Sequence, residues 1–112
     1  MPRIPRADRL VIENTLTPLE ASLEALHDPA DHEGADSELA GVMKCKGCEQ
    51  RLQLRRVLDH RLTKKDGVFV WKLGIERTEA LPPNAASVLN GIATASPGNS
   101  GRINAIKGKL GL

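Results

Sequence analysis

Residues 12–26 read IENTLTPLEASLEAL, and they carry the strongest periodic signal in the chain. Apolar side chains recur there at spacings of four, three, four and three residues, the pattern of a helix that packs along another helix. The members of this leucine seam are Ile12, Leu16, Leu19, Leu23 and Leu26. Pro18 interrupts the pattern, because an interior proline loses a backbone hydrogen bond and clashes with the preceding turn. We therefore predict two short helices, over residues 6–15 and 18–27, or one kinked helix.

The composition favours packed helices around one core. The chain has 112 residues, which is the usual size of one domain. Hydrophobic residues make up 40% of it but aromatic residues only 2%, so Leu, Ile, Val and Ala must fill the interior. A β-sandwich would draw more on aromatic and β-branched residues. We expect a mainly α fold, a single domain over residues 1–112 with four to five helices.

Charge is distributed in blocks along the chain. Residues 1–40 hold nine Asp/Glu against three Arg, residues 41–65 hold eight Lys/Arg against two acids, and residues 66–112 hold five against three. We interpret these blocks as an acidic helical part over 1–40, a basic long helix over 41–65 and a C-terminal helical pair over 84–110. Such blocks can compensate within one fold, pair across a dimer, or present a basic face to nucleic acid or an acidic protein.

The middle of the chain predicts a long helix followed by a lone strand. A helix from about residue 37 to 64, capped by Asp36 or Ser37, would carry apolar residues on more than one side, as a central or shared helix does. Lys65-Asp66-Gly67 indicates a stop, and a period-2 pattern follows that predicts a single short β-strand near 68–76. No second strand is evident, so this strand should pair with its own copy or with a partner's sheet.

The C-terminal pair has the layout of a helix-turn-helix. Asn84 can cap a helix over residues 85–95, a turn follows, and a second helix is expected over 101–110. A DNA-binding alternative would use the basic helix and this pair, through Arg51, Arg55, Arg56, Arg102 and Lys107. Binding of single strands or RNA is disfavoured, because there are almost no aromatic side chains on which bases could stack.

Cys45-Lys46-Gly47-Cys48 is the most distinctive local motif. Two thiolates at this spacing can share one tetrahedral zinc ion, but one such pair supplies only half a site. The other ligands would have to come from His27, His32 or His60, or from a second subunit. We interpret the pair first as two buried structural cysteines, which gives no expected metal or cofactor; zinc binding and a redox role are the alternatives.

The segment His27-Asp28-Pro29-Ala30-Asp31-His32 gathers histidine and aspartate between two helices. It could bind a divalent metal or act in acid–base chemistry. We interpret it as a solvated capping loop, because polar residues serve that purpose at helix junctions. No Walker, Rossmann or zincin motif occurs in the sequence, so no catalytic residues are predicted.

The leading functional hypothesis is a non-enzymatic regulator that binds, and inhibits, another protein such as a transcription factor or an enzyme complex. Its predicted anchors are the leucine seam together with Phe69 and Trp71. The seam and the lone strand also predict a homodimer. No export signal or membrane span is evident, and two cysteines are too few for a disulfide framework, so we expect a cytoplasmic protein with no membrane partner.

Overall fold

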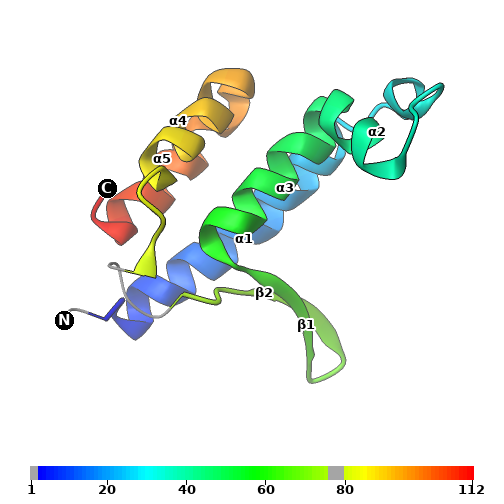
Figure 1. Ribbon diagram of the computed structural model, residues 1–112. Helices are drawn as coiled ribbons and strands as arrows, with labels where there is room; N and C mark the ends of the chain where they lie inside the picture. The colour runs from blue at the N-terminus through cyan, green and yellow to red at the C-terminus, as the bar shows by residue number, and fades with distance from the viewer. Residues whose placement is uncertain (1–2, 76–79) are drawn as a thin grey trace.

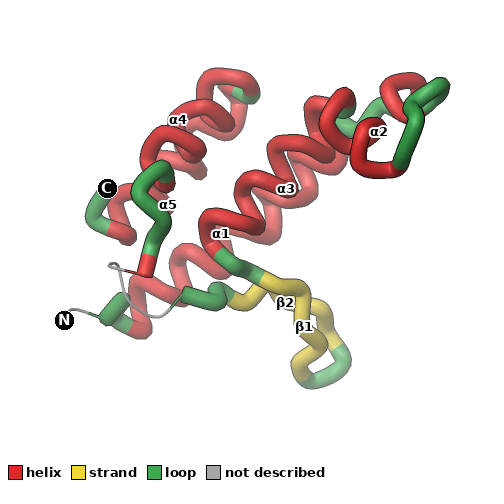
Figure 2. Tube along the Cα trace, viewed as in Figure 1, coloured by secondary structure: helices red, strands yellow, loops and turns green. Residues whose placement is uncertain are grey.

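A β-hairpin projects from a body of packed helices (Figure 1). This computed structural model describes residues 3–75 and 80–112. The described residues form five α-helices and one two-stranded antiparallel sheet, which confirms the mainly α fold (Figure 2). The helices are α1 (Arg6–Glu24), α2 (Glu38–Lys44), α3 (Lys46–Leu58), α4 (Ala85–Ala95) and α5 (Ser100–Leu110), with the 3-10 turns η1 (Pro29–His32) and η3 (Pro97–Asn99). The strands are β1 (Arg61–Lys65) and β2 (Val68–Lys72).

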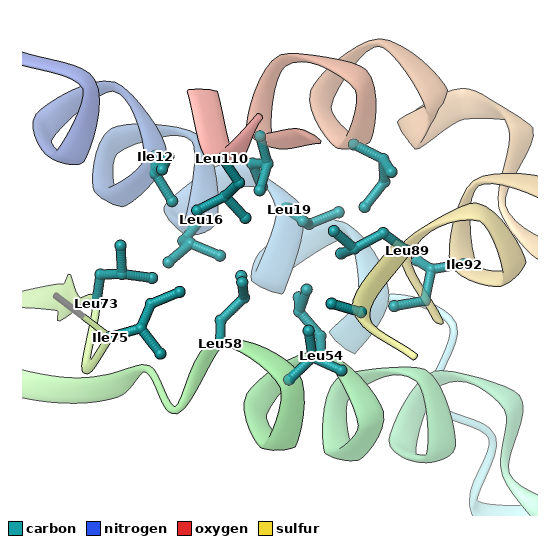
Figure 3. Close-up of a cluster of buried hydrophobic side chains, with 14 of the residues drawn as sticks. Ile12, Leu16, Leu19, Leu54, Leu58, Leu73, Ile75, Leu89, Ile92 and Leu110 are labelled. Atoms are coloured by element: carbon teal, nitrogen blue, oxygen red, sulfur yellow. The ribbon is translucent and has the colours of Figure 1, made fainter. Parts of the chain in front are cut away.

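Helix α1 is continuous through Pro18, and its leucine seam lies in the core of this chain. Helices α3 and α5 pack directly on α1, and Figure 3 shows side chains of α1, α3, α4 and α5 meeting in one cluster. The four fully buried seam residues are Ile12, Leu16, Leu19 and Leu23. The prediction that these four bind a second molecule is therefore corrected, because helices of the same chain cover them. Leu26 follows the end of α1 and remains partly exposed.

The prediction of one long helix over 41–65 is wrong. The chain leaves helical geometry at Cys45, whose φ of −76° and ψ of 114° are extended, so two helices, α2 and α3, replace one. Helix α3 then ends at Leu58, and Asp59 adopts a left-handed φ of 47°. Ser37 is the N-cap of α2, as predicted, and its side chain accepts a hydrogen bond of 3.1 Å from the backbone N–H of Ala40.

The predicted strand is present as β2, but it pairs with β1 of the same chain rather than with a second molecule. Lys65 and Val68 lie opposite each other, which leaves Asp66 and Gly67 as a two-residue turn. Both turn residues have positive φ, 53° and 80°, as a type I′ hairpin turn requires. The lone-strand prediction failed because Arg61–Lys65 had been assigned to the helix. The hairpin removes one reason for expecting a homodimer, and the burial of the seam and the break in the long two-sided helix remove the others.

The C-terminal helical pair agrees with the prediction to within one residue. Helix α4 starts after Asn84, and α5 follows directly from the turn η3. Both helices send apolar side chains into the core; those buried are Leu89, Ile92, Ile103, Ile106 and Leu110. None of the described helices combines the length and the apolar character that a membrane crossing would need.

A buried carboxylate on α1 joins the acidic and the basic block. Glu20 accepts hydrogen bonds from Arg51 Nε at 3.2 Å and Arg55 Nη2 at 3.0 Å, and its Oε1 lies 2.7 Å from His60 Nε2. Burial raises the pKa of the Glu20 carboxyl, but the hydrogen bonds and positive charges of His60 and Arg55 outweigh it, so the pKa lies below its ordinary value of 4.5. Charge compensation within the fold therefore accounts for part of both blocks.

Replacing Glu20 by Gln should lower the free energy of unfolding by about 2 kcal/mol at neutral pH, because the charged acceptor of a buried network is lost. The folded pKa of Glu20 is depressed, so its stabilisation is present above the unfolded pKa and disappears as pH falls through the folded value. Urea denaturation of both proteins as a function of pH measures the difference, which should shrink in acid. Asp8→Asn is the control: Asp8 pairs with Lys109 at 3.3 Å near the surface, so less than about 1 kcal/mol should change. An equal effect of both variants would contradict the role of Glu20.

Candidate metal centre

Helix α2 lies beside the end of α1 and the beginning of α3 (Figure 1). Two histidines and two cysteines from these segments converge there. One possible ligand atom from each of His27, His32, Cys45 and Cys48 lies within 4.8 Å of the others. The two nitrogens and two sulfurs come from segments 13 residues apart in sequence, between His32 and Cys45. Imidazole and thiolate are the ligands that zinc prefers in structural sites.

The histidines are placed by the end of α1 and by a capped 3-10 turn. The backbone N–H of His27 donates to the carbonyl of Glu24 at 2.9 Å, which continues the turn beyond the helix. The Asp28 carboxylate accepts a hydrogen bond of 3.0 Å from the N–H of Ala30 and so caps η1. His32 is the last residue of η1, which turns its ring back toward His27; the two ring centroids are 4.8 Å apart.

The cysteines are placed by the interruption between α2 and α3. Cys45 is the N-cap of α3, and Cys48 lies in the first turn of that helix. The positive end of the helix dipole stabilises negative charge at this position, which favours thiolates over thiols. The break that shortens the predicted long helix therefore brings both sulfurs to a helix N-terminus.

The interatomic distances match a tetrahedral N₂S₂ zinc site. His27 Nδ1 lies 3.1 Å from Cys48 Sγ and 3.5 Å from Cys45 Sγ, and His32 Nε2 lies 3.6 Å from Cys48 Sγ. With Zn–S of about 2.3 Å and Zn–N of about 2.0–2.1 Å, tetrahedral geometry places nitrogen and sulfur about 3.6 Å apart. The ligand atoms lie up to 4.8 Å apart, against about 3.8 Å for two sulfurs on one tetrahedral zinc ion, so binding all four requires side-chain shifts of about 1 Å.

The two thiols have different acidities. Burial raises the pKa of the Cys45 thiol, but hydrogen bonds from the backbone N–H groups of Asp28 and Cys48, and from the side chains of His32 and Cys48, outweigh burial and lower that pKa to about 6. Burial raises the pKa of the Cys48 thiol, and the adjacent Cys45 raises it further. One thiolate is therefore favoured by the protein alone, whereas a pair of thiolates calls for a cation between them.

Glycine at two positions allows the segments that carry the four ligand atoms to approach one another closely. A Cβ on Gly47 would lie 2.5 Å from the carbonyl oxygen of Leu23 and 2.9 Å from the backbone nitrogen of His27. A Cβ on Gly41, in α2, would lie 2.6 Å from Nδ1 of His32. Both contacts are shorter than real Cβ atoms make, so any larger residue would push a ligand-bearing segment away. The space around the four ligands thus depends on glycine in two separate helices.

The structure brings together four of the five possible metal ligands named from sequence. Cys45 and Cys48 belong to the cluster, whereas His60 lies against Glu20 and takes no part in it. The remaining ligands are His27 and His32, which the sequence placed in a solvated loop. Their signal was a His-x4-His spacing upstream of Cys-x2-Cys, two half-sites that together make four ligands.

The other predicted site residues are scattered. Arg51 and Arg55 bind Glu20, while the side chains of Arg102 and Lys107 donate to neighbouring asparagines of the helical pair. Arg56 is exposed. Four of the five nucleic-acid candidates are thus engaged in hydrogen bonds within the chain. Phe69 is exposed, and Trp71 is partly buried against the core.

Comparisons with models of protein families, with curated proteins and with solved structures gave no match to this chain.

Gly47→Ala should destabilise the zinc-loaded protein by about 2 kcal/mol or more, because its Cβ would collide with backbone atoms of Leu23 and His27. Gly91→Ala is the matched control: it lies within α4 with nothing within 4 Å of its Cβ, so the higher helix propensity of alanine should stabilise by about 0.5–1 kcal/mol. Thermal denaturation of both variants should show a lower melting temperature for Gly47→Ala and a higher one for Gly91→Ala than for the wild type. A neutral or stabilising Gly47→Ala would contradict the close approach of α3 to the end of α1.

Proposed function

We propose that this protein is a non-enzymatic binding module whose fold is completed by one structural zinc ion, held by His27, His32, Cys45 and Cys48. The observation that carries the proposal is the convergence of these four ligand atoms within 4.8 Å of one another. Four protein ligands fill a tetrahedral zinc sphere, so no position is left open for a substrate or an activated water. A closed site of this kind supports a structural role rather than catalysis.

The hydrophobic core explains what the metal would do. No residue between Leu23 and Leu54 belongs to the buried apolar cluster, although this part of the chain includes all of α2. Helix α2 has seven residues, of which Gly41 alone is buried, and its large apolar side chains Leu39 and Met43 point to solvent. Such a segment buries too little apolar surface to order itself, and zinc coordination replaces the missing packing with about 10 kcal/mol or more of binding energy.

A role in binding another macromolecule remains the proposal for biological activity, as a regulator or an inhibitor of its partner. The leucine seam no longer supports it, because four of its five members are buried within the chain. The residues that support a binding role are instead the exposed apolar residues of the hairpin, Leu62, Val68 and Phe69. Exposed large apolar side chains that lie together mark an interaction surface more often than isolated ones do.

Purified protein should contain one zinc ion per chain, measured by elemental analysis together with protein concentration. Cys48→Ser should lose most of the metal, and a chelator should then unfold both the variant and the wild type to the same state. His27→Cys should keep the metal, because a Cys₃His set also binds zinc. Cobalt substitution provides a second measurement, since its visible bands report thiolate ligands.

His60→Gln is the control for this experiment, since His60 is the one histidine outside the cluster. It should keep one zinc per chain even where it lowers stability through its contact with Glu20. Wild-type protein without stoichiometric metal after zinc reconstitution, or unchanged zinc content in Cys48→Ser, would contradict the proposed centre.

A further inference from the structure

The only phenylalanine and the only tryptophan of the chain lie on one face of the hairpin. Phe69 and Trp71 are two positions apart in β2, so their side chains point to the same side of the strand. Lys64 lies opposite Phe69, and Leu62 lies opposite Trp71. These four residues define the aromatic face, which is carried on the ribbon that projects from the helical body (Figure 1).

By leaving Phe69 exposed, the fold loses the stability that burying one of its two large aromatic side chains would provide. The Phe69 side chain is 64% exposed, although burying a Phe stabilises a fold by about 1.5–3 kcal/mol. Leu62 beside it is also exposed. A cation lies over each ring: Lys64 Nζ is 5.9 Å from the centre of Phe69, and the Arg55 guanidinium is 5.0 Å from the centre of Trp71. The face thus combines aromatic rings with positive charge.

The hairpin as a whole is basic. Residues 61–72 contain four Lys/Arg and one acid, Asp66 in the turn. Within the described part of the chain, Lys64 and Lys65 form no ion pair. Arg61 does pair with Asp59, at 3.5 Å, but both side chains are well exposed, and such a pair contributes little. Lys72 pairs with Glu13 at 3.7 Å, at the base of the hairpin. The positive charge that the ribbon presents without a partner in the described part of the chain is therefore that of Lys64 and Lys65.

We propose that this ribbon binds single-stranded nucleic acid, with a base stacked on the exposed Phe69 and phosphates held by Lys64 on the same face. Lys65 and Arg61, on the opposite face, add to the positive charge that attracts the phosphate backbone. An aromatic side chain on an exposed strand, flanked by basic residues, is the surface on which proteins stack unpaired bases, and each stacked base contributes about 1–3 kcal/mol. The nucleic-acid proposal depends on the proposed zinc site in one respect: zinc would keep the helical body folded. The nucleic-acid proposal replaces the sequence-based expectation that the chain has too few aromatic side chains to bind single strands. The one phenylalanine and the one tryptophan lie on the same face of the hairpin.

Other occupants fit the hairpin less well. A second copy paired along β1 would place Arg61, Lys64 and Lys65 against the same residues, and like charges on facing strands repel. Protein interfaces are depleted in lysine, whereas this ribbon has Lys64, Lys65 and Lys72 among twelve residues. A duplex could accept a two-stranded ribbon in its major groove, but its stacked bases offer no free face to Phe69.

Fluorescence anisotropy with the zinc-loaded full chain tests the proposal. The probes are labelled oligo(dT) and oligo(rU) of about twelve nucleotides and a duplex of the same length. At low salt, about 50 mM, both single strands should bind more tightly than the duplex, and affinity should fall as salt rises. Trp71, the single tryptophan, is two positions from Phe69, so its fluorescence should change when a strand binds there.

Phe69→Ala should weaken single-strand binding by about tenfold, and Lys64→Glu with Lys65→Glu by at least as much. Leu39→Ala is the matched control for Phe69, because Leu39 is 61% exposed on α2, away from the hairpin. Lys107→Glu is the charge control, and it also tests the helix-turn-helix alternative. Both controls should leave affinity unchanged.

Absence of binding at low salt, tighter binding to the duplex, or full affinity in Phe69→Ala would each overturn the proposal. A loss of binding in Lys107→Glu alone would do the same, by assigning nucleic-acid contact to the helical pair. Zinc content is measured on the same samples, which separates the two proposals. Protein with one zinc ion and no oligonucleotide binding contradicts the hairpin alone, whereas metal-free protein that binds contradicts the zinc centre alone.

Discussion

The fold depends on holding the C-terminal end of α1 against the beginning of α3. Glu20 and His27 do this together with the apolar seam, and Glu13, in the first half of α1, binds the segment that follows β2. Glu13 accepts the N–H of Leu73 at 3.0 Å, Glu20 binds the arginines of α3, and His27 meets the cysteines. A helix repeats its orientation about every seven residues, so Glu13 and Glu20 lie on the same side of α1. The candidate metal centre lies at the end of α1 where the hydrophobic core stops.

This arrangement also fixes the base of the hairpin while leaving its tip exposed. His60, just before β1, lies against Glu20, and its ring meets Trp71 edge-on at 5.1 Å. The N–H of Leu73, just after β2, binds Glu13. An isolated two-stranded hairpin is only marginally stable, and packing against a helix supplies what it lacks. The body can therefore present a defined ribbon without burying its outer residues.

Local signals were enough to predict α1, the start of α2 and the C-terminal pair, but not the break between α2 and α3 or the elements that depend on distant contacts. The seam of α1, the Ser37 cap and the C-terminal pair follow from 3.6-residue periodicity and capping, which are properties of short segments. The hairpin was missed because all five residues of β1 are exposed, so it shows no apolar alternation. Asp66-Gly67 was the available signal, since this dipeptide favours a two-residue turn. The cysteine pair was visible as half a site, but only the turn at η1 brings His27 and His32 to it.

X-ray absorption at the zinc edge of the reconstituted protein tests the central claim most directly, because it reports the ligands of the metal itself. We expect two nitrogen scatterers at about 2.0–2.1 Å and two sulfur scatterers at about 2.3 Å, in fourfold coordination. A shell of nitrogen and oxygen without sulfur, or one of four sulfurs shared between two chains, would contradict a centre formed by His27, His32, Cys45 and Cys48 of one molecule.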